Sequence, residues 1–245
     1  MPRRSRLHVP KHHSRPGEAP DFSYLETSPA GAVHRPDVNA RVRDIGNLST
    51  ELVRVLDDRH VAVGQWNPHL DSPELQIGLR HMLLTRIFDE RMQRAQRQGK
   101  TSFYMRSLGE EAVSVAQGMA LRPSDMLFPA YRNQGLYMVR GRPLVDLMCQ
   151  LLSNTRDMCK GRQLPVMYHW AEGRIFSISG NLTTQFPQAV GWAMAAAIKG
   201  EDDIAVSWIG EGSSAEADFH HAMLFASVYM APVILNIVNN QWAIS

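Results

Sequence analysis

The sequence has few cysteines, almost no net charge and no long hydrophobic run. Its two cysteines, Cys149 and Cys159, match neither a disulfide framework nor a zinc-binding spacing. A net charge of +2 gives no reason to expect a nucleic-acid partner. No apolar segment approaches the roughly 18–20 residues of a membrane helix. These absences indicate a globular protein with reduced thiols in a cytosol-like compartment.

The first 70 residues differ in composition from the rest, because they are rich in Pro, His, Arg and Asp. We expect an extended N-terminal arm over residues 1–70, with one short helix near residues 49–56. Residues 1–17 are basic and contain no acid, which is compatible with a transit peptide or with a tail that clasps a partner. The prolines within this tail weigh against the amphipathic helix of a transit peptide.

The compact part is expected over residues 71–245 and to open with a long helix. Ser72 is a candidate N-cap, and Pro73 suits the first turn. The following apolar residues recur at a spacing of three and four, which predicts a helix that buries this face. They are Leu75, Leu79, Met82, Leu83 and Ile87. Further helices are predicted over residues 110–121, 133–139, 143–152 and 185–199, with a short strand over residues 126–129.

Residues 204–238 predict a strand, a turn, a helix and a second strand. The strands are expected over residues 204–209 and 233–238, and the helix over residues 213–229. Alternation of strands and helices is typical of a parallel sheet flanked by helices, so the predicted fold class is α/β.

The turn of this unit places one acid, Glu211, between Gly210 and Gly212. Ser213 and Glu216 have the spacing of a capping box, and free N–H groups at a helix start favour a phosphate. A carboxylate beside a phosphate requires a cation between them, and Mg²⁺ prefers such oxygen ligands. The turn therefore suggests a magnesium and phosphate site.

Asn240 follows the second strand of the same unit. Parallel strands present their carboxyl ends on one side of the sheet, so Glu211 and Asn240 are expected to converge. Taken alone, a glycine-flanked acid is typical of a tight turn, and an Asn-Asn pair is typical of a cap. Both motifs in this order favour a shared ion site.

The glycine–acid–glycine turn, followed just under thirty residues later by an Asn-Asn pair, resembles the thiamine-diphosphate motif. Four further segments resemble the α subunit of branched-chain 2-oxoacid dehydrogenases, particularly bacterial forms. They are residues 102–105 (SFYM), 108–112 (LGEEA), 160–165 (KGRQLP) and 239–245 (NNQWAIS). The resemblance covers nearly the whole chain and implies a thiamine-diphosphate-binding fold.

The resemblance implies roles for individual residues. The Mg²⁺ ligands would be the side chains of Glu211 and Asn240 and the carbonyl of Trp242. The matching diphosphate-contacting positions are Tyr131, Arg132, Gly210, Gly212 and Ser213. Taken alone, Arg132 is equally compatible with a surface ion pair.

Two further groups of residues match family positions around the rest of the cofactor. Gly180 falls where the aminopyrimidine is contacted, and Leu182 falls where an apolar residue supports the bent cofactor. Ser179, Thr184 and Gln185 match a potassium site that some members have, although they could equally cap the helix beginning near residue 185.

The resemblance implies thiamine-diphosphate-dependent oxidative decarboxylation of branched-chain 2-oxoacids, with acyl transfer to a lipoyl group. No catalytic residue is expected in this chain, because the family's glutamate at the aminopyrimidine N1′ belongs to the β subunit. The implied partners are that β subunit, in an α₂β₂ heterotetramer, and a lipoyl-bearing acyltransferase core. The implied compartment is the bacterial cytoplasm, or alternatively the mitochondrial matrix.

Two alternatives remain open. The substrate could be pyruvate, acetoin or 2-oxoglutarate, or the chain could be a non-catalytic binding or assembly module. Family α subunits continue well beyond the position of Ser245, where this sequence stops. We therefore expect a sheet that is incomplete at the C-terminus, with an exposed strand edge, and no activity by the chain alone.

Overall fold

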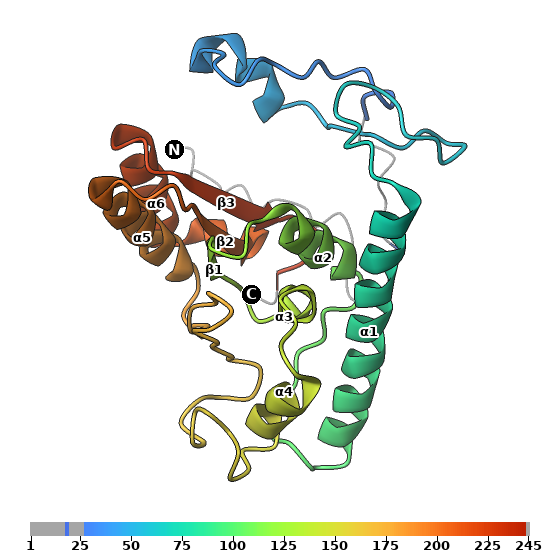
Figure 1. The fold of residues 1–245 in the computed structure, drawn as a ribbon, viewed down its shortest axis with the longest axis vertical. Helices are drawn as coiled ribbons and strands as arrows, with labels where there is room; N and C mark the ends of the chain where they lie inside the picture. Colours follow the sequence, from blue (N-terminus) through green and yellow to red (C-terminus); the bar gives the residue numbers. More distant parts are fainter. Residues whose placement is uncertain (1–17, 20–26, 244–245) are drawn as a thin grey trace, which may run out of the picture. The chain divides into compact units, whose positions relative to one another are not determined.

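The computed structural model describes residues 18–19 and 27–243 (Figure 1). The chain divides into two compact units, Met1–Leu70 and Asp71–Ser245. The expected basic tail at residues 1–17 lies outside the described residues.

The described part of the first unit contains two 3₁₀ helices, η1 (Val42–Asp44) and η2 (Gly46–Ser49). The predicted helix over residues 49–56 is wrong, because residues 51–55 have no regular secondary structure. Their backbone bonds to distant segments instead: the N–H of Val63 donates to the carbonyl of Val55 at 2.9 Å. A bridge between Leu56 and Ala62 continues this antiparallel pairing.

The second unit is built on a parallel sheet, which confirms the predicted fold class. Its strands are β1 (Met126–Phe128), β2 (Ala205–Gly210) and β3 (Val233–Val238), in the order β1-β2-β3. Both strand pairs are parallel. Strand β3 pairs only with β2 among the described residues, so its other edge is open.

Helices cover both faces of the sheet (Figure 1). Val206 and Trp208 of β2 lie in one core with α1 (Ser72–Arg97), α3 (Gln134–Val139) and α4 (Leu144–Leu151). The alternate residues Ala205 and Ile209 pack against α5 (Gln185–Lys199), and Ile209 also contacts the core of α6 (Ala217–Val228). A strand buried on both faces explains why β2 is apolar except for Ser207, whose hydroxyl donates to the Phe128 carbonyl at 3.0 Å.

Helix α5 and strand β3 begin and end as predicted, and α2 (Glu111–Ala120), α3, α4 and β1 differ by a residue or two at their ends. Helix α6 begins four residues later than predicted, because Glu211–Ala215 form a 3₁₀ helix, η3. The predicted capping box of Ser213 and Glu216 is therefore wrong, and Glu216 makes no side-chain cap. In the described ranges, no helix combines the length and the apolar character needed to cross a membrane.

The start and the buried face of α1 also differ from the prediction. Asp71, not Ser72, is the N-cap, and it forms a capping box with Glu74. The predicted apolar face is wrong: Leu75, Leu79, Leu83 and Ile87 are each more than half exposed. The buried face consists of Thr85, Phe88, Asp89 and Met92.

Asp89 explains why α1 buries a partly polar face. Its carboxylate is fully buried and accepts hydrogen bonds from the Tyr104 hydroxyl at 2.5 Å and from the Ser107 N–H at 2.7 Å. The Ser107 hydroxyl donates a third at 3.1 Å. Burial raises the pKa of Asp89, and the three donors oppose this effect. The network anchors the segment before α2 to α1.

Replacing Asp89 with alanine should therefore destabilise the fold by about 3 kcal/mol, because it leaves buried donors without an acceptor. The free energy of unfolding from urea denaturation measures this effect. Glu90→Ala is the matched control: Glu90 is exposed and its ion pair with Arg94 is long, at 3.9 Å, so the expected change is below about 0.5 kcal/mol. Equal effects of the two changes would contradict the proposed anchoring role.

Candidate functional site

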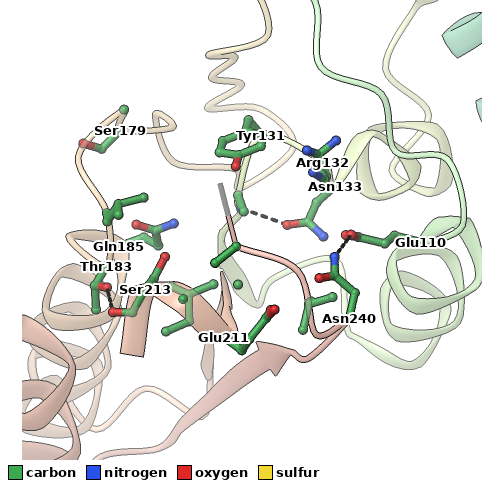
Figure 2. Close-up of a pocket in the computed structure, with 18 of the residues that line it drawn as sticks. Glu110, Tyr131, Arg132, Asn133, Ser179, Thr183, Gln185, Glu211, Ser213 and Asn240 are labelled. Carbon is green, nitrogen blue, oxygen red and sulfur yellow. Dashed lines mark hydrogen bonds between the residues drawn. The ribbon is translucent and has the colours of Figure 1, made fainter. Parts of the chain in front are cut away.

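A pocket of about 360 Å³ lies at the carboxyl ends of the strands of the second unit (Figure 2). All predicted site residues except Thr184 line it. They are Tyr131, Arg132, Ser179, Gly180, Leu182, Gln185, Gly210, Glu211, Gly212, Ser213, Asn240 and Trp242. The topology thus brings together residues from four separate segments of the chain.

The strand register places Glu211 and Asn240 at the same edge of the sheet. Gly210 pairs with Val238, so the residues that follow the two strands enter the pocket side by side. The Oε1 atom of Glu211 is buried and has no hydrogen-bond partner among the described residues. A buried carboxylate oxygen without a partner carries a large desolvation cost, which a bound donor or cation relieves.

Asn240 is held at both ends of its amide. Its Oδ1 accepts the N–H of Trp242 at 3.0 Å, and its Nδ2 donates to Glu110 Oε1 at 3.2 Å. Burial raises the pKa of the Glu110 carboxyl, although the Arg132 guanidinium opposes the shift. Glu110 lines the pocket but was not predicted as a site residue.

The two glycines of the turn serve different purposes. A Cβ at Gly212 would lie 2.8 Å from the Cβ of Ala243, so this glycine permits the close approach of the segment after β3. At Gly210 a Cβ would meet nothing within 4 Å, and the φ of −79° suits any residue. The neighbouring protein atoms therefore require glycine at position 212 but not at position 210.

The loop that carries Tyr131 and Arg132 is fixed by a neighbour, Asn133. This buried side chain accepts the N–H of Ala130 at 2.8 Å and donates to the Ser114 hydroxyl at 3.0 Å. Arg132 makes no ion pair with any described carboxylate; its Nη1 donates to the Arg106 carbonyl at 2.5 Å. Its guanidinium also lies over the Tyr131 ring, 5.4 Å from the centroid. The surface ion pair considered for Arg132 is therefore excluded within the described chain.

Residues 179–185 form the opposite wall of the pocket. The Nε2 of Gln185 donates to the Trp208 carbonyl at 3.2 Å, while its buried Oε1 has no partner in the part of the chain that the structure describes. The Thr184 hydroxyl donates to the Asn181 carbonyl at 3.1 Å and does not cap α5. Leu182 is about half exposed and presents an apolar surface to the pocket.

Thr183 connects this wall to the turn after β2. Its buried hydroxyl donates to the Ser213 carbonyl at 2.6 Å. Its φ of +66° is unfavourable for a β-branched residue, so surrounding contacts must hold it there. Nothing in the sequence signals this conformation, whereas the Asn133 turn could have been suspected from its residue type.

The oxygen atoms around Glu211 fit a hard cation better than a transition metal. Across the described ranges, no group of three or more His, Cys, Asp or Glu side chains could hold a metal ion. One carboxylate, one amide oxygen and backbone carbonyls make an incomplete set for Mg²⁺, which commonly uses one or two carboxylates with phosphate oxygens. The residues therefore fit Mg²⁺ if a phosphate-bearing ligand completes its coordination.

The architecture defines an α/β ligand-binding domain with its site at the strand ends. The sequence model of the dehydrogenase E1 component family matches residues 79–245. The model of the 2-oxoisovalerate dehydrogenase E1 alpha subunit N-terminal segment matches residues 3–42. The chain therefore belongs to the dehydrogenase E1 component family, which confirms the predicted family.

Individual relatives carry a consistent description. The chain is 60% identical over 240 residues to 2-oxoisovalerate dehydrogenase subunit alpha of Pseudomonas aeruginosa, covering 98% of this chain and 58% of that protein. It is 40% identical over 179 residues to the mitochondrial subunit of Dictyostelium discoideum, and 38% identical over 179 residues to that of Homo sapiens. These two matches cover 73% of this chain and 41% and 40% of the relatives. The chain thus spans only about half of the length of these relatives, between 40% and 58%.

Replacing Thr183 with valine should destabilise the second unit by about 0.5–1.5 kcal/mol, because the buried Ser213 carbonyl loses one of its two donors and keeps only the N–H of Glu216 at 3.1 Å. Valine has nearly the same shape and the same β-branch, so backbone strain stays constant. Thr183→Ser retains the hydroxyl and is the control. Thermal denaturation of the three chains measures the effect, and a valine variant as stable as the serine variant would argue against this bond as a stabilising contact.

Proposed function

We propose that this chain carries the α-subunit half of a thiamine-diphosphate and Mg²⁺ site in a branched-chain 2-oxoacid dehydrogenase. The observation that carries the proposal is the convergence of Asn240 with Glu211, whose buried Oε1 has no partner among the described residues. The relatives' names supply the substrate class, and membership of the E1 family implies thiamine diphosphate. Bound thiamine diphosphate supplies the chemistry that decarboxylates a 2-oxoacid and passes the acyl group to a lipoyl group.

The residues of this chain bind and orient rather than react. Glu211, the Asn240 amide and the Trp242 carbonyl are the proposed Mg²⁺ ligands. The diphosphate would lie along Gly210, Gly212 and Ser213, with Arg132 and Tyr131 on the opposite side. Arginine suits this position because it presents several fixed donors to phosphate oxygens.

The opposite wall is proposed to hold the rest of the cofactor. Gly180 leaves space for the aminopyrimidine, since a Cβ there would meet only Met167 Cε at 4.0 Å. Leu182 presents the apolar surface that would support the bent cofactor. The Gln185 Oε1, which has no partner among the described residues, supports a K⁺ site with Ser179 of the same wall, whereas the Thr184 hydroxyl is engaged within its own turn.

The proposed assembly supplies what this chain lacks. A β subunit would contribute the glutamate at the aminopyrimidine N1′, and a lipoyl-bearing acyltransferase core would accept the acyl group. The division into an arm and a cofactor-binding domain, and a bacterial cytoplasmic location, belong to the same proposal. The bacterial relative, at 60% identity, supports the latter.

Glu211→Ala should weaken Mg²⁺-dependent binding of thiamine diphosphate by about 100-fold, because the site loses its strongest proposed ligand. Calorimetry on the 245-residue chain purified with its β subunit measures this loss. Glu216→Ala is the control, since Glu216 is an exposed carboxylate five residues away that does not line the pocket. Unchanged Mg²⁺-dependent binding by the Glu211 variant would rule out the site.

The choice of substrate requires a separate measurement. An α/β complex whose α subunit continues past Ser245 to the family's full length should decarboxylate 2-oxoisovalerate at least tenfold more efficiently than pyruvate, as judged by kcat/KM. A preference for pyruvate would favour the pyruvate dehydrogenase alternative. Thiamine-diphosphate binding without decarboxylation of either acid would favour a non-catalytic module.

A further inference from the structure

Glu110 is a pocket-lining carboxylate to which the proposed function assigns no role. It directly precedes α2 and makes no side-chain capping bond to that helix. Instead, its Oε1 lies 3.2 Å from the Nδ2 of Asn240, although 130 positions separate the two residues. Figure 2 shows the Glu110 carboxylate reaching across the pocket rim to the Asn240 amide. The start of α2 therefore does not need this side chain, whereas the strand end contacts it.

An asparagine that binds a metal must present its oxygen and not its nitrogen. The two ends of the amide have nearly the same shape, so only hydrogen bonds decide which end points where. An ionised carboxylate only accepts, so Glu110 can bind only the Nδ2 end. The Trp242 N–H only donates, so it selects the Oδ1 end. The two contacts favour the same orientation of the Asn240 amide.

We propose that Glu110 is a positioning residue of the cation site, which fixes the Asn240 amide so that Oδ1 is available to the metal. The inference rests on the proposed function, because it assumes that Asn240 is a Mg²⁺ ligand. Groups that orient a metal ligand contribute to affinity without touching the metal, typically by about 10–100-fold. The positioning effect of Glu110 requires an amide at position 240, whereas its charge also faces Glu211 and Arg132.

The test uses Mn²⁺ as a spectroscopic probe of the Mg²⁺ site. Electron paramagnetic resonance measures Mn²⁺ affinity in the presence of thiamine diphosphate, on the chain purified with its β subunit. Glu110→Ala should weaken Mn²⁺ binding by about 10–100-fold. In an Asn240→Ala background the same change should have less than a twofold effect, because the group that Glu110 positions is gone. Glu110→Gln keeps an acceptor oxygen and should stay within about threefold of the unmutated protein.

An equal loss in both backgrounds would overturn the inference, because Glu110 would then act independently of Asn240. The inference would also be overturned if Glu110→Ala caused no loss of Mn²⁺ affinity in the protein that keeps Asn240. If the unmutated protein binds no Mn²⁺, or if Glu211→Ala leaves binding unchanged, the proposed function itself fails. If Mn²⁺ binding instead depends on Glu211 but is unaffected by Glu110→Ala, the proposed function stands and only the inference about Glu110 fails.

A second background keeps the test decisive if Glu110→Ala does not fold. Asn240→Asp replaces the amide by a carboxylate that Glu110 repels. The effect of Glu110→Gln on Mn²⁺ affinity should then differ at least threefold between the protein that keeps Asn240 and the Asn240→Asp protein, because only the amide at position 240 offers a donor. Equal effects in the two proteins would show that the two side chains do not interact at the site, and would overturn the inference.

Discussion

The candidate site depends on the parallel register between β2 and β3. Because Gly210 pairs with Val238, the first residues beyond the two strands enter one pocket. A slip by one residue would move the side chains of a strand to opposite faces. In β2 such a slip would exchange the environments of Trp208 and Ile209, both fully buried in different cores. Core packing on the two faces therefore specifies the register, and the register specifies the pocket.

A partly buried polar network adds to this constraint and extends it to α2. The Trp208 indole donates to Gln117 Oε1 at 2.6 Å, and Gln117 Nε2 donates to Asn236 Oδ1 at 3.0 Å. Asn236 Nδ2 donates in turn to the Ser207 carbonyl at 2.9 Å. These directional bonds join β2, β3 and α2, and are formed only when each amide is in register. Since α2 starts next to Glu110, the network that aligns the strands also places Glu110 opposite Asn240.

The sequence predicts features that depend on local patterns, but not those that depend on contacts between distant residues. The strand–helix–strand unit could be predicted because its periodicity and turn residues are local. The motif residues that line the pocket could be predicted for the same reason. The buried face of α1 could not be predicted. Residue spacing identifies an apolar stripe, but it does not identify Asp89, whose carboxylate binds Tyr104 on the face that is buried. The predicted start of α6 is too early because Glu211–Ala215 form a 3₁₀ helix, and the Ser213 carbonyl within it accepts a hydrogen bond from Thr183, thirty positions away. Glu110 was assigned to its helix start for the same reason: its partner is distant in sequence.

The charges around the pocket explain why a cation and an anion should bind there together. Glu110 and Glu211 are carboxylates, and Arg132 is the guanidinium that lines the pocket with them. A phosphate entering alone would meet more negative than positive charge, whereas a cation alone would find few protein ligands for its coordination shell. Each ligand supplies what the other lacks, because a divalent cation offsets the carboxylates and phosphate oxygens complete its coordination. Strong linkage between the two binding steps follows from this charge arrangement.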